Sequence, residues 1–417
     1  MGRDGTLRVL FAPETFNLGE TSRAIEVARH LRRSGHEVRF MGYSRRFADH
    51  VRDAGFTIEL LDPELGEDEA DQLIAADQGR SIRLPFTTAM VRERVASELS
   101  LFRGWEPDCV VIGTTLSTFI SARSASRPLI YVRPYAMSRS HLDAMTTFPV
   151  MQGHTWIGGQ INRLAGRFVR AVAPKIRWKP ASFRRIAGEY RVRLPSRTLE
   201  ALDADLNLIA SLFPYLDAQA MSSGEIAVGA VFSQSEGEVP ASVLALAKTG
   251  RPVVYVGLGS SGNRQLALDI LHQVGEIDVE IVSSVGHYLH QGDREHLPPN
   301  VHVYDFLPAH KLAGLIDASV IHGGEGTVQT ACASGAPFAG IGLQAEQRFN
   351  IDECVRYGNA SRFTPRDIKR HRLPSIVTTL LIDTAMRRAA EELQKAQAVG
   401  AENAAREIAD FVSRRMR

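Results

Sequence analysis

Short apolar runs alternate with segments of helical spacing along most of this chain. Leu7–Ala12 is a first apolar run, Thr21–Arg33 places its apolar residues on one side of a helix, and Glu37–Met41 is a second run. A strand, a helix and a strand in this order predict a βαβ unit and a parallel sheet. Further strands of this kind are predicted at Asp108–Ile112, Pro128–Val132, Asp205–Ala210 and Ile226–Gly229.

The same alternation starts again in the second half of the chain. Polar, turn-rich Ser233–Pro240 predicts a linker between two domains. Beyond it, strands are predicted at Pro252–Val256, Val279–Ser283, Val301–Tyr304, Ala318–Ile321 and Phe338–Ile341. The pattern therefore predicts an α/β fold of two Rossmann-like, doubly wound parallel-sheet domains that face a central cleft, with ligands bound beyond the carboxyl ends of the strands. We place these domains at residues 1–235 and 236–400, and at 401–417 a C-terminal helix that packs back on the N-terminal domain.

Residues 134–195 interrupt this alternation and are rich in Arg, Met, Trp and Phe. An insertion mounted on a rigid sheet is usually functional. Tyr135, Phe148, Trp156 and Trp178 could shape an aromatic pocket, or they could belong to the core.

The composition argues against several classes of protein. The 417 residues carry a net charge of only +2, without the basic block that nucleic-acid binding needs. The three cysteines form no CxxC pair, so neither a zinc site nor a disulfide framework is expected. No run approaches the roughly 18 apolar residues of a membrane span, and Met1–Thr6 lacks the apolar core of a signal peptide. We therefore expect a cytoplasmic protein.

Two glycine-rich segments each follow a predicted strand and precede a predicted helix. Gly257-Leu258-Gly259-Ser260-Ser261-Gly262 matches GxGxxG, whose glycines let backbone N–H groups approach a diphosphate at a helix N-terminus. An NAD site is expected to have an acidic residue at the end of the next strand. Val279–Ser284 ends in serines instead and has Glu280 inside it, so NAD is disfavoured. Ile321-His322-Gly323-Gly324-Glu325-Gly326-Thr327 forms a second anion nest, in which His322 can donate a hydrogen bond to phosphate.

The C-terminal half resembles the UDP-glycosyltransferase and macrolide-glycosyltransferase superfamily, which has the GT-B fold. Asn300-Val301 and Asp305-Phe306-Leu307-Pro308 match the segment before its donor loop, and His322-Gly323-Gly324-x-Gly326-Thr327 matches that loop. Gly335-Ala336-Pro337 and Glu346-Gln347-x-x-Asn350 match its Gly-Val-Pro and Asp-Gln-x-x-Asn segments. The resemblance implies an N-terminal acceptor-binding domain, a C-terminal nucleotide-sugar-binding domain and metal-independent transfer that uses no cofactor besides the donor.

It also implies roles for individual residues. Expected to bind the donor diphosphate are Gly259, Ser260, His322, Gly324, Gly326 and Thr327. Expected at the base and ribose are Phe306, Leu307, Gln329 and Thr330. Expected at the sugar are Glu346 and Gln347, whose adjacent acid and amide offer both acceptors and donors to hydroxyl groups. The DxD-like Asp203-Ala204-Asp205 merely precedes a buried strand, and no metal site is expected there.

This chain departs from the family pattern at two positions. Glu20 stands where most relatives have a general-base His, so either a buried carboxylate of raised pKa takes that role, or the acceptor nucleophile is a thiol or amine that needs no base. The other interpretation of Glu20 is a helix N-terminal acid favoured by the helix dipole. Thr330 replaces a Glu that holds the ribose, which leaves UDP, dTDP and GDP all open.

The sequence therefore predicts an inverting glycosyltransferase that moves a sugar from a nucleotide sugar to a small-molecule acceptor of bacterial secondary metabolism, with Glu20 and His322 as catalytic residues. The alternatives are a catalytically silent GT-B auxiliary protein and a nucleotide-sugar epimerase. Neither nucleic acid nor a membrane span is expected, and a homodimer is left open.

Overall fold

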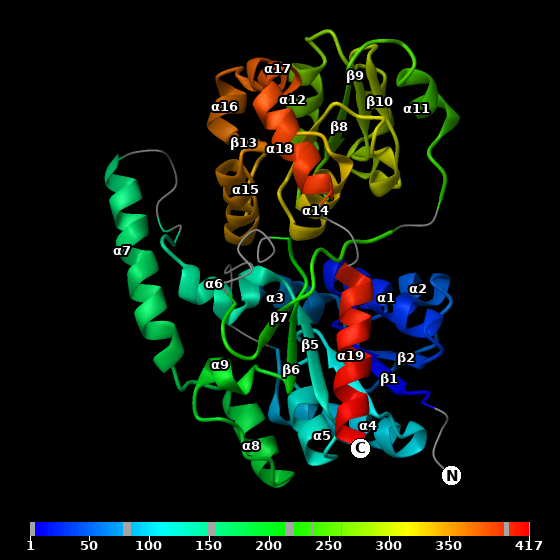
Figure 1. Cartoon of the computed structure of the whole chain (residues 1–417), viewed down its shortest axis with the longest axis vertical. Coiled ribbons are helices and arrows are strands. Elements are labelled where there is room, and N and C mark those ends of the chain that lie inside the picture. Colours follow the sequence, from blue (N-terminus) through cyan, green and yellow to red (C-terminus); the bar gives the residue numbers. More distant parts are fainter. Residues whose placement is uncertain are drawn as a thin grey trace. The chain divides into compact units, whose positions relative to one another are not determined.

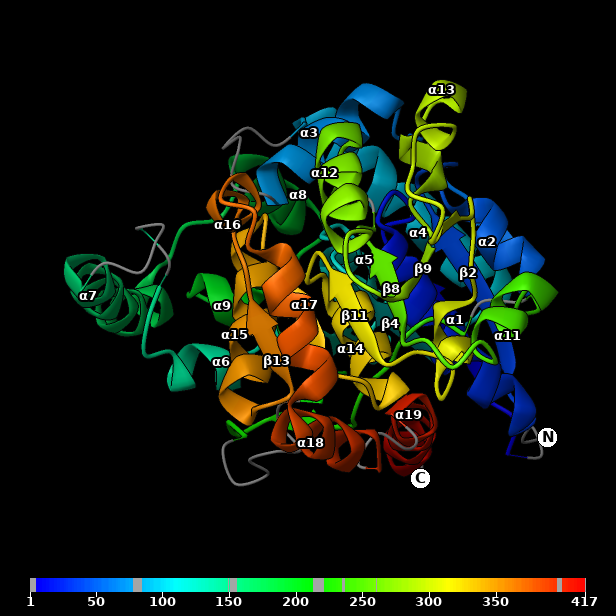
Figure 2. The ribbon, with the colours of Figure 1, turned by 90° about the horizontal axis from the view of Figure 1, so that it is seen from above.

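The computed structural model describes residues 5–77, 85–148, 150, 156–212, 221–234, 237–259, 261–395 and 400–416. The chain divides into two compact units, unit 1 with residues 1–231 and 399–417, and unit 2 with residues 232–398. Each unit is built on one parallel sheet covered by helices (Figures 1 and 2).

Unit 1 holds a seven-stranded sheet in the order β3-β2-β1-β4-β5-β6-β7, and every pairing is parallel. Its strands are β1 (Arg8–Ala12), β2 (Glu37–Gly42), β3 (Ile58–Leu60), β4 (Cys109–Ile112), β5 (Leu129–Arg133), β6 (Leu206–Ile209) and β7 (Glu225–Ala227). Its helices are α1 (Leu18–Arg33), α2 (Ala48–Asp53), α3 (Glu67–Asp77), α4 (Thr88–Trp105), α5 (Thr118–Ser124), α6 (Arg139–Ala144), α7 (Trp156–Val172), α8 (Ala181–Glu189), α9 (Thr198–Ala201) and α19 (Gly400–Met416), with 3-10 turns η1 (Tyr135–Met137) and η2 (Ala173–Lys175).

The core of unit 1 lies on both faces of this sheet. Along β1, Val9 and Phe11 pack into one apolar cluster while Leu10 and Ala12 pack into another. Successive side chains of a strand point to opposite faces, so a strand buried on both sides reads as the continuous apolar run found at Leu7–Ala12.

The last helix belongs to unit 1 although residues 232–398 separate it from the rest of that unit. In α19, Ala404, Ala405, Ile408 and Val412 recur at helical spacing and are buried in the cluster that contains Leu31 of α1. The two helices contact each other, as Figure 1 shows for the blue α1 and the red α19.

Unit 2 holds a six-stranded parallel sheet in the order β10-β9-β8-β11-β12-β13. Its strands are β8 (Val253–Gly257), β9 (Glu280–Ser283), β10 (Val301–Val303), β11 (Ala318–Ile321), β12 (Phe338–Gly340) and β13 (Ala360–Arg362). Its helices are α11 (Ala241–Leu246), α12 (Arg264–Val274), α13 (Gln291–Arg294), α14 (Glu325–Ser334), α15 (Ala345–Tyr357), α16 (Pro365–Lys369), α17 (Leu373–Ile382) and α18 (Thr384–Lys395), with 3-10 turns η4 (Gly286–Tyr288) and η5 (Ala309–Leu312).

The predicted fold of two doubly wound parallel sheets is confirmed. The pattern missed β3 and β13, which are three-residue edge strands with a polar residue in the middle, Glu59 and Ser361. No helix within the described ranges is both long enough and apolar enough to cross a bilayer.

Candidate active site

Both glycine-rich loops of unit 2 start where the strand order of its sheet reverses. β8 and β11 are neighbours in the middle of the sheet, with Gly257 opposite Ile321, and the chain leaves β8 towards one edge and β11 towards the other. Such a switch point, at the carboxyl ends of parallel strands, is where open α/β sheets bind ligands.

His322 lies between the two loops and is only 6% exposed. A Cβ atom on Gly259 would lie 2.5 Å from Cε1 of His322, and one on Gly324 would lie 2.5 Å from its Nε2. Only glycine can therefore occupy positions 259 and 324 while the imidazole stays in place, and the φ of +52° at Gly259 also favours glycine.

The burial of His322 also fixes its charge. Desolvation lowers the pKa of its imidazole to about 4, which leaves the ring neutral at pH 7. Its buried Nδ1 has no hydrogen-bond partner among the described residues. A neutral imidazole carries one N–H donor and one acceptor nitrogen, so the ring can donate one hydrogen bond to a ligand oxygen.

The N-terminus of α14 opens directly after His322. Gly324 occupies the N-cap position, and no described side chain caps the helix. The first backbone bond of the helix runs from the N–H of Val328 to the carbonyl of Gly324, at 2.9 Å. A Cβ atom on Gly326 would meet nothing within 4 Å, so space is open above the first turn. This end of α14 has the features of an anion site.

Gln347 joins the loop that follows β8 to the start of α15. Its Oε1 accepts from the N–H groups of Leu343 and Gln344, at 3.0 and 3.2 Å, and its Nε2 donates to Oγ of Ser261 at 3.0 Å. The side chain is 2% exposed. In the structure, the amide of Gln347 thus holds backbone in place beside the position predicted for the sugar.

Glu346 is tied to the donor loop through Asn350. Nδ2 of Asn350 donates to Oε1 of Glu346 at 2.7 Å and to the carbonyl of Gly323 at 3.2 Å. The structure therefore places the predicted sugar pair, Glu346 and Gln347, next to the predicted phosphate loop.

Tyr288 supports the first loop and was not anticipated from the sequence. Its hydroxyl donates to the carbonyl of Gly259 at 2.6 Å and accepts from the N–H of Gly262 at 3.0 Å. One hydroxyl thereby holds both ends of the turn. Ser260, predicted to bind the diphosphate, lies outside the described residues.

The residues predicted at the base and ribose differ in exposure. Phe306 is 58% exposed, so its ring is open to stacking, whereas Leu307 and Gln329 are buried. Oγ1 of Thr330 donates to the carbonyl of Gly326 one turn earlier, at 2.8 Å. That hydroxyl keeps acceptor capacity for a ribose, but its proton is already used within α14.

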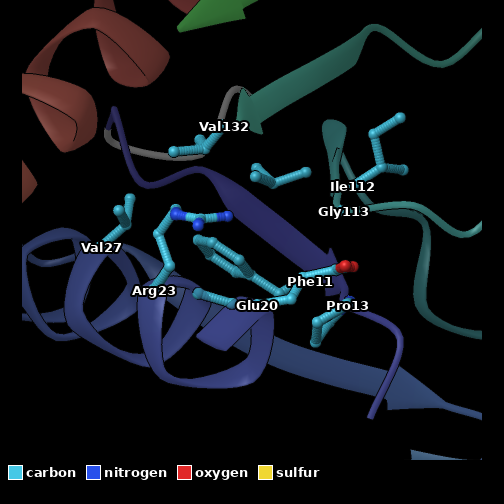
Figure 3. A pocket seen from close by; sticks show the side chains of 10 residues that line it. Phe11, Pro13, Glu20, Arg23, Val27, Ile112, Gly113 and Val132 are labelled. Atoms are coloured by element: carbon cyan, nitrogen blue, oxygen red, sulfur yellow. The ribbon is translucent and has the colours of Figure 1, made fainter. Parts of the chain in front are cut away.

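In unit 1, Glu20 lines a pocket at the corresponding switch point, between β1 and β4 (Figure 3). The pocket has about 250 Å³ of empty space, part of it open to solvent. Arg23 and Glu20 come from α1, Phe11 and Pro13 from β1 and the residue after it, and Gly113 follows β4. A Cβ atom on Gly113 would collide with the carboxyl group of Glu20, at 1.4 Å from Oε1.

The carboxyl group of Glu20 is held by three donors. Oε1 accepts from the N–H groups of Glu14 and Thr114, both at 2.8 Å, and Oε2 accepts from Oγ1 of Thr114 at 2.9 Å. Desolvation nevertheless dominates, helped by the nearby charge of Glu14, and raises the pKa of Glu20 to about 7. Glu20 also sits in the first turn of α1, where the helix dipole favours an anion, but burial outweighs that effect.

Two other acidic candidates have structural partners. Glu280 pairs with Arg251 at 2.7 Å and with His302 at 3.0 Å. Asp203 pairs with Arg133 and Arg139, and Asp205 accepts from the N–H of Leu129. Across the described ranges, no group of three or more His, Cys, Asp or Glu residues is arranged to hold a metal ion.

Comparisons with known proteins find similarity to glycosyltransferases. Residues 268–413 match the family described as erythromycin biosynthesis protein CIII-like, C-terminal domain. The chain is 25% identical over 401 residues to the PGL/p-HBAD biosynthesis rhamnosyltransferase of Mycobacterium bovis (strain BCG / Pasteur 1173P2), which covers 93% of this chain and 84% of that protein. It is 30% identical over 151 residues to tylactone mycaminosyltransferase of Streptomyces fradiae, covering 35% of this chain and 33% of that one.

The solved structure of glycosyltransferase VinC in complex with dTDP has a TM-score of 0.71 at 21% identity, and the match covers 98% of this chain and all of VinC. The fold is thus GT-B, and the protein is a nucleotide-sugar-dependent glycosyltransferase. Within that class, residues 268–413 resemble the C-terminal domain of the macrolide-type glycosyltransferases.

Proposed function

We propose that this enzyme transfers a sugar, with inversion and without a metal ion, from a nucleoside-diphosphate sugar to a small-molecule acceptor of natural-product type. The observation that carries the proposal is the pairing of the uncapped N-terminus of α14 with the neutral, buried imidazole of His322. Both supply hydrogen-bond donors to a diphosphate that gains charge as it leaves.

The proposed chemistry has one displacement. The acceptor nucleophile attacks the anomeric carbon of the sugar, the bond from that carbon to the diphosphate oxygen breaks, and the diphosphate departs with both electrons. Donors preorganised at the leaving group stabilise this charge, which is commonly the largest electrostatic contribution to such a reaction. His322, Gly324, Gly326 and Thr327 are proposed to bind the diphosphate together with Gly259 and Ser260.

Glu20 is proposed to accept the proton of an acceptor hydroxyl. A general base works best when its pKa lies near the operating pH, and the pKa of about 7 fits that requirement. A thiol or amine acceptor, which needs no base, is the alternative.

UDP, dTDP and GDP are the proposed donor nucleotides, and dTDP is the first to test because VinC binds it. Phe306, Leu307, Gln329 and Thr330 would contact the base and ribose, and Glu346 and Gln347 the sugar. The exposed ring of Phe306 supports a stacking role.

The test is thermal unfolding of wild type and His322→Ala with UDP, dTDP, GDP, ADP or NAD. A ligand at 100 times its Kd stabilises the native state by about 2.7 kcal/mol, or roughly 5–10 °C for a unit of this size. We expect such a shift with one of the first three nucleotides. His322→Ala should weaken binding by about 10- to 100-fold, because it removes a hydrogen bond to a charged group, and should abolish turnover.

His371→Ala is the matched control, since this exposed histidine of unit 2 pairs only with Glu276 among the contacts described. It should keep the wild-type shift. A full shift and normal turnover in His322→Ala would refute the assignment of the donor site, and stabilisation by NAD alone would refute the nucleotide-sugar proposal.

A further inference from the structure

Helix α7 carries its large apolar side chains on an outer face. Ile157, Leu164 and Phe168 are 65%, 69% and 66% exposed, and Ile161 and Val172 are also exposed. At about 100° per residue, these five positions fall within roughly 80° of one another around the helix. They form one continuous stripe along the described length of α7.

The opposite side of α7, not the stripe, is the packed one. Gly158 and Gly166 are buried there, and a Cβ atom on Gly166 would lie 2.7 Å from the backbone of Thr147. The backbone N–H of Phe148 donates to the carbonyl of Asn162 at 2.8 Å. Glycines thus let the helix sit against residues 146–148 of its own unit, and the apolar stripe faces away from them. Figures 1 and 2 both show α7 standing apart from the sheet of unit 1.

The charges on α7 and on the segment that follows it have one sign. Residues 156–188 contain eight Arg and Lys and neither Asp nor Glu, whereas the whole chain has a net charge of only +2. Arg163, Arg167 and Arg170 are exposed on α7. Arg167 lies about 60° beyond one edge of the stripe, and Arg163 and Arg170 lie roughly 100–120° beyond it, on the polar side of the helix. Trp178 follows shortly after the helix and is 65% exposed.

We propose that α7 is a peripheral membrane-binding helix that lies flat on an anionic phospholipid surface, with its apolar stripe in the acyl boundary and its arginines at the phosphates. An exposed apolar stripe and arginines on the polar side are features of such helices, and the exposed Trp178 nearby is of the residue type found at membrane interfaces. Charge complementarity favours this occupant over a second copy of the chain, because pairing two α7 helices would bring three arginines of each copy together while α7 itself carries no acid.

The experiment is co-sedimentation with vesicles of phosphatidylcholine alone or mixed in equal parts with phosphatidylglycerol. Wild type should bind the mixed vesicles at least tenfold more tightly, and raised salt should weaken that binding. The variant L164Q/F168Q should lose at least about tenfold because it removes two inserted side chains. R163Q/R167Q/R170Q should lose the preference for anionic vesicles, on the order of fivefold per arginine.

Two further measurements keep the result unambiguous. Ile382→Gln, on an equally exposed apolar residue of α17, should bind vesicles as wild type does. The fluorescence of Trp178, obtained as the difference between wild type and W178F, should shift to the blue on mixed vesicles. Absence of wild-type binding, or unchanged binding by L164Q/F168Q, would overturn the proposal. A wild-type dimer that L164Q/F168Q converts to monomers, without vesicle binding, would also overturn it and assign the face to self-association.

Discussion

Burial of the ionised Glu20 carboxyl group destabilises the folded state, and its hydrogen bonds do not fully offset this effect. Three donors hold its carboxyl group, yet burial raises its pKa from 4.5 to about 7. The native state therefore binds this proton more tightly than the unfolded chain does. By linkage, Glu20 lowers stability increasingly as the pH rises from 4.5 to 7, and the penalty is fully present above pH 7. A buried acid whose raised pKa lowers the stability of the folded state is typical of a functional site.

Replacing Glu20 by Gln should separate activity from stability. Gln resembles the protonated carboxyl, and Oγ1 of Thr114 can turn to accept from its amide. We expect Glu20→Gln to exceed wild type in stability at pH 8 by an amount of order 3 kcal/mol, with the difference vanishing near pH 4. Its kcat/KM should fall by about 10²- to 10⁴-fold, while wild-type kcat/KM rises with pH to a plateau above about pH 7. Denaturant unfolding and initial rates across pH measure both effects.

Glu37→Gln is the matched control, because Glu37 is an exposed acid of the same unit whose ion pair with Arg8 is 3.2 Å long. An exposed pair contributes roughly 0–1 kcal/mol, so this variant should show normal rates and no comparable dependence on pH. If Glu20→Gln is stabilised but retains its rate, Glu20 is not the base and a thiol or amine acceptor is favoured.

The residues around His322 differ in how far the sequence could predict them. That Gly259 and Gly324 are needed could be anticipated, because glycines in a loop between a strand and a helix indicate close backbone approach, but the packing of Gly259 against His322 could not. Tyr288 could not, since it lies 29 residues from Gly259 and no motif marks it. The proximity of Cys332 and Cys354, with sulfur atoms 3.8 Å apart, likewise depends on how α14 and α15 pack.

At the scale of elements, the loop after β8 depends on a support that lies outside it. Tyr288→Phe removes the hydroxyl that bonds Gly259 and Gly262. We expect unfolding free energy to fall by only about 0.5–1.5 kcal/mol, because the loop is small. Affinity for the nucleoside diphosphate should fall about three- to tenfold, since the loop must be ordered on binding. Isothermal titration calorimetry measures this loss.

Tyr255→Phe provides the comparison, because its hydroxyl bonds Ser284 at 2.8 Å and neither Gly259 nor Gly262. It should cost similar stability and leave the affinity nearly unchanged. Equal losses of affinity in the two variants would show that Tyr288 has no specific role in the loop.

Most strands could be predicted because parallel strands are buried on both faces and read as apolar runs. β11 was predicted at Ala318–Ile321, where the structure has it. β3 and β13 could not be predicted in this way, because each is a three-residue strand at the edge of a sheet and is too short and too polar to form an apolar run. For α7 the sequence marked only an interruption of the pattern. Apolar spacing shows that a helix has a stripe, but it does not show that glycines form the packed side.

At the scale of the whole molecule, the chain returns to unit 1 after it has completed unit 2. The spacing of Ala404, Ala405, Ile408 and Val412 predicts one covered face on the last helix. Spacing cannot identify the partner of that face, because any apolar surface would satisfy it. In the structure, the partner includes α1, the helix that carries Glu20.

Packing of α19 should therefore stabilise unit 1 and its pocket without affecting ligand binding in unit 2. Ile408 is fully buried, and Ile408→Ala should cost unit 1 about 2–5 kcal/mol because it leaves a cavity beside α1. In scanning calorimetry, the transition of unit 1 should move to lower temperature, while the nucleoside diphosphate still raises the transition of unit 2. Ile382→Ala, on a 72% exposed residue of α17, should move neither transition appreciably. If Ile408→Ala lowered nucleotide affinity as strongly as it lowered stability, α19 would be coupled to the donor site and not simply part of the core of unit 1.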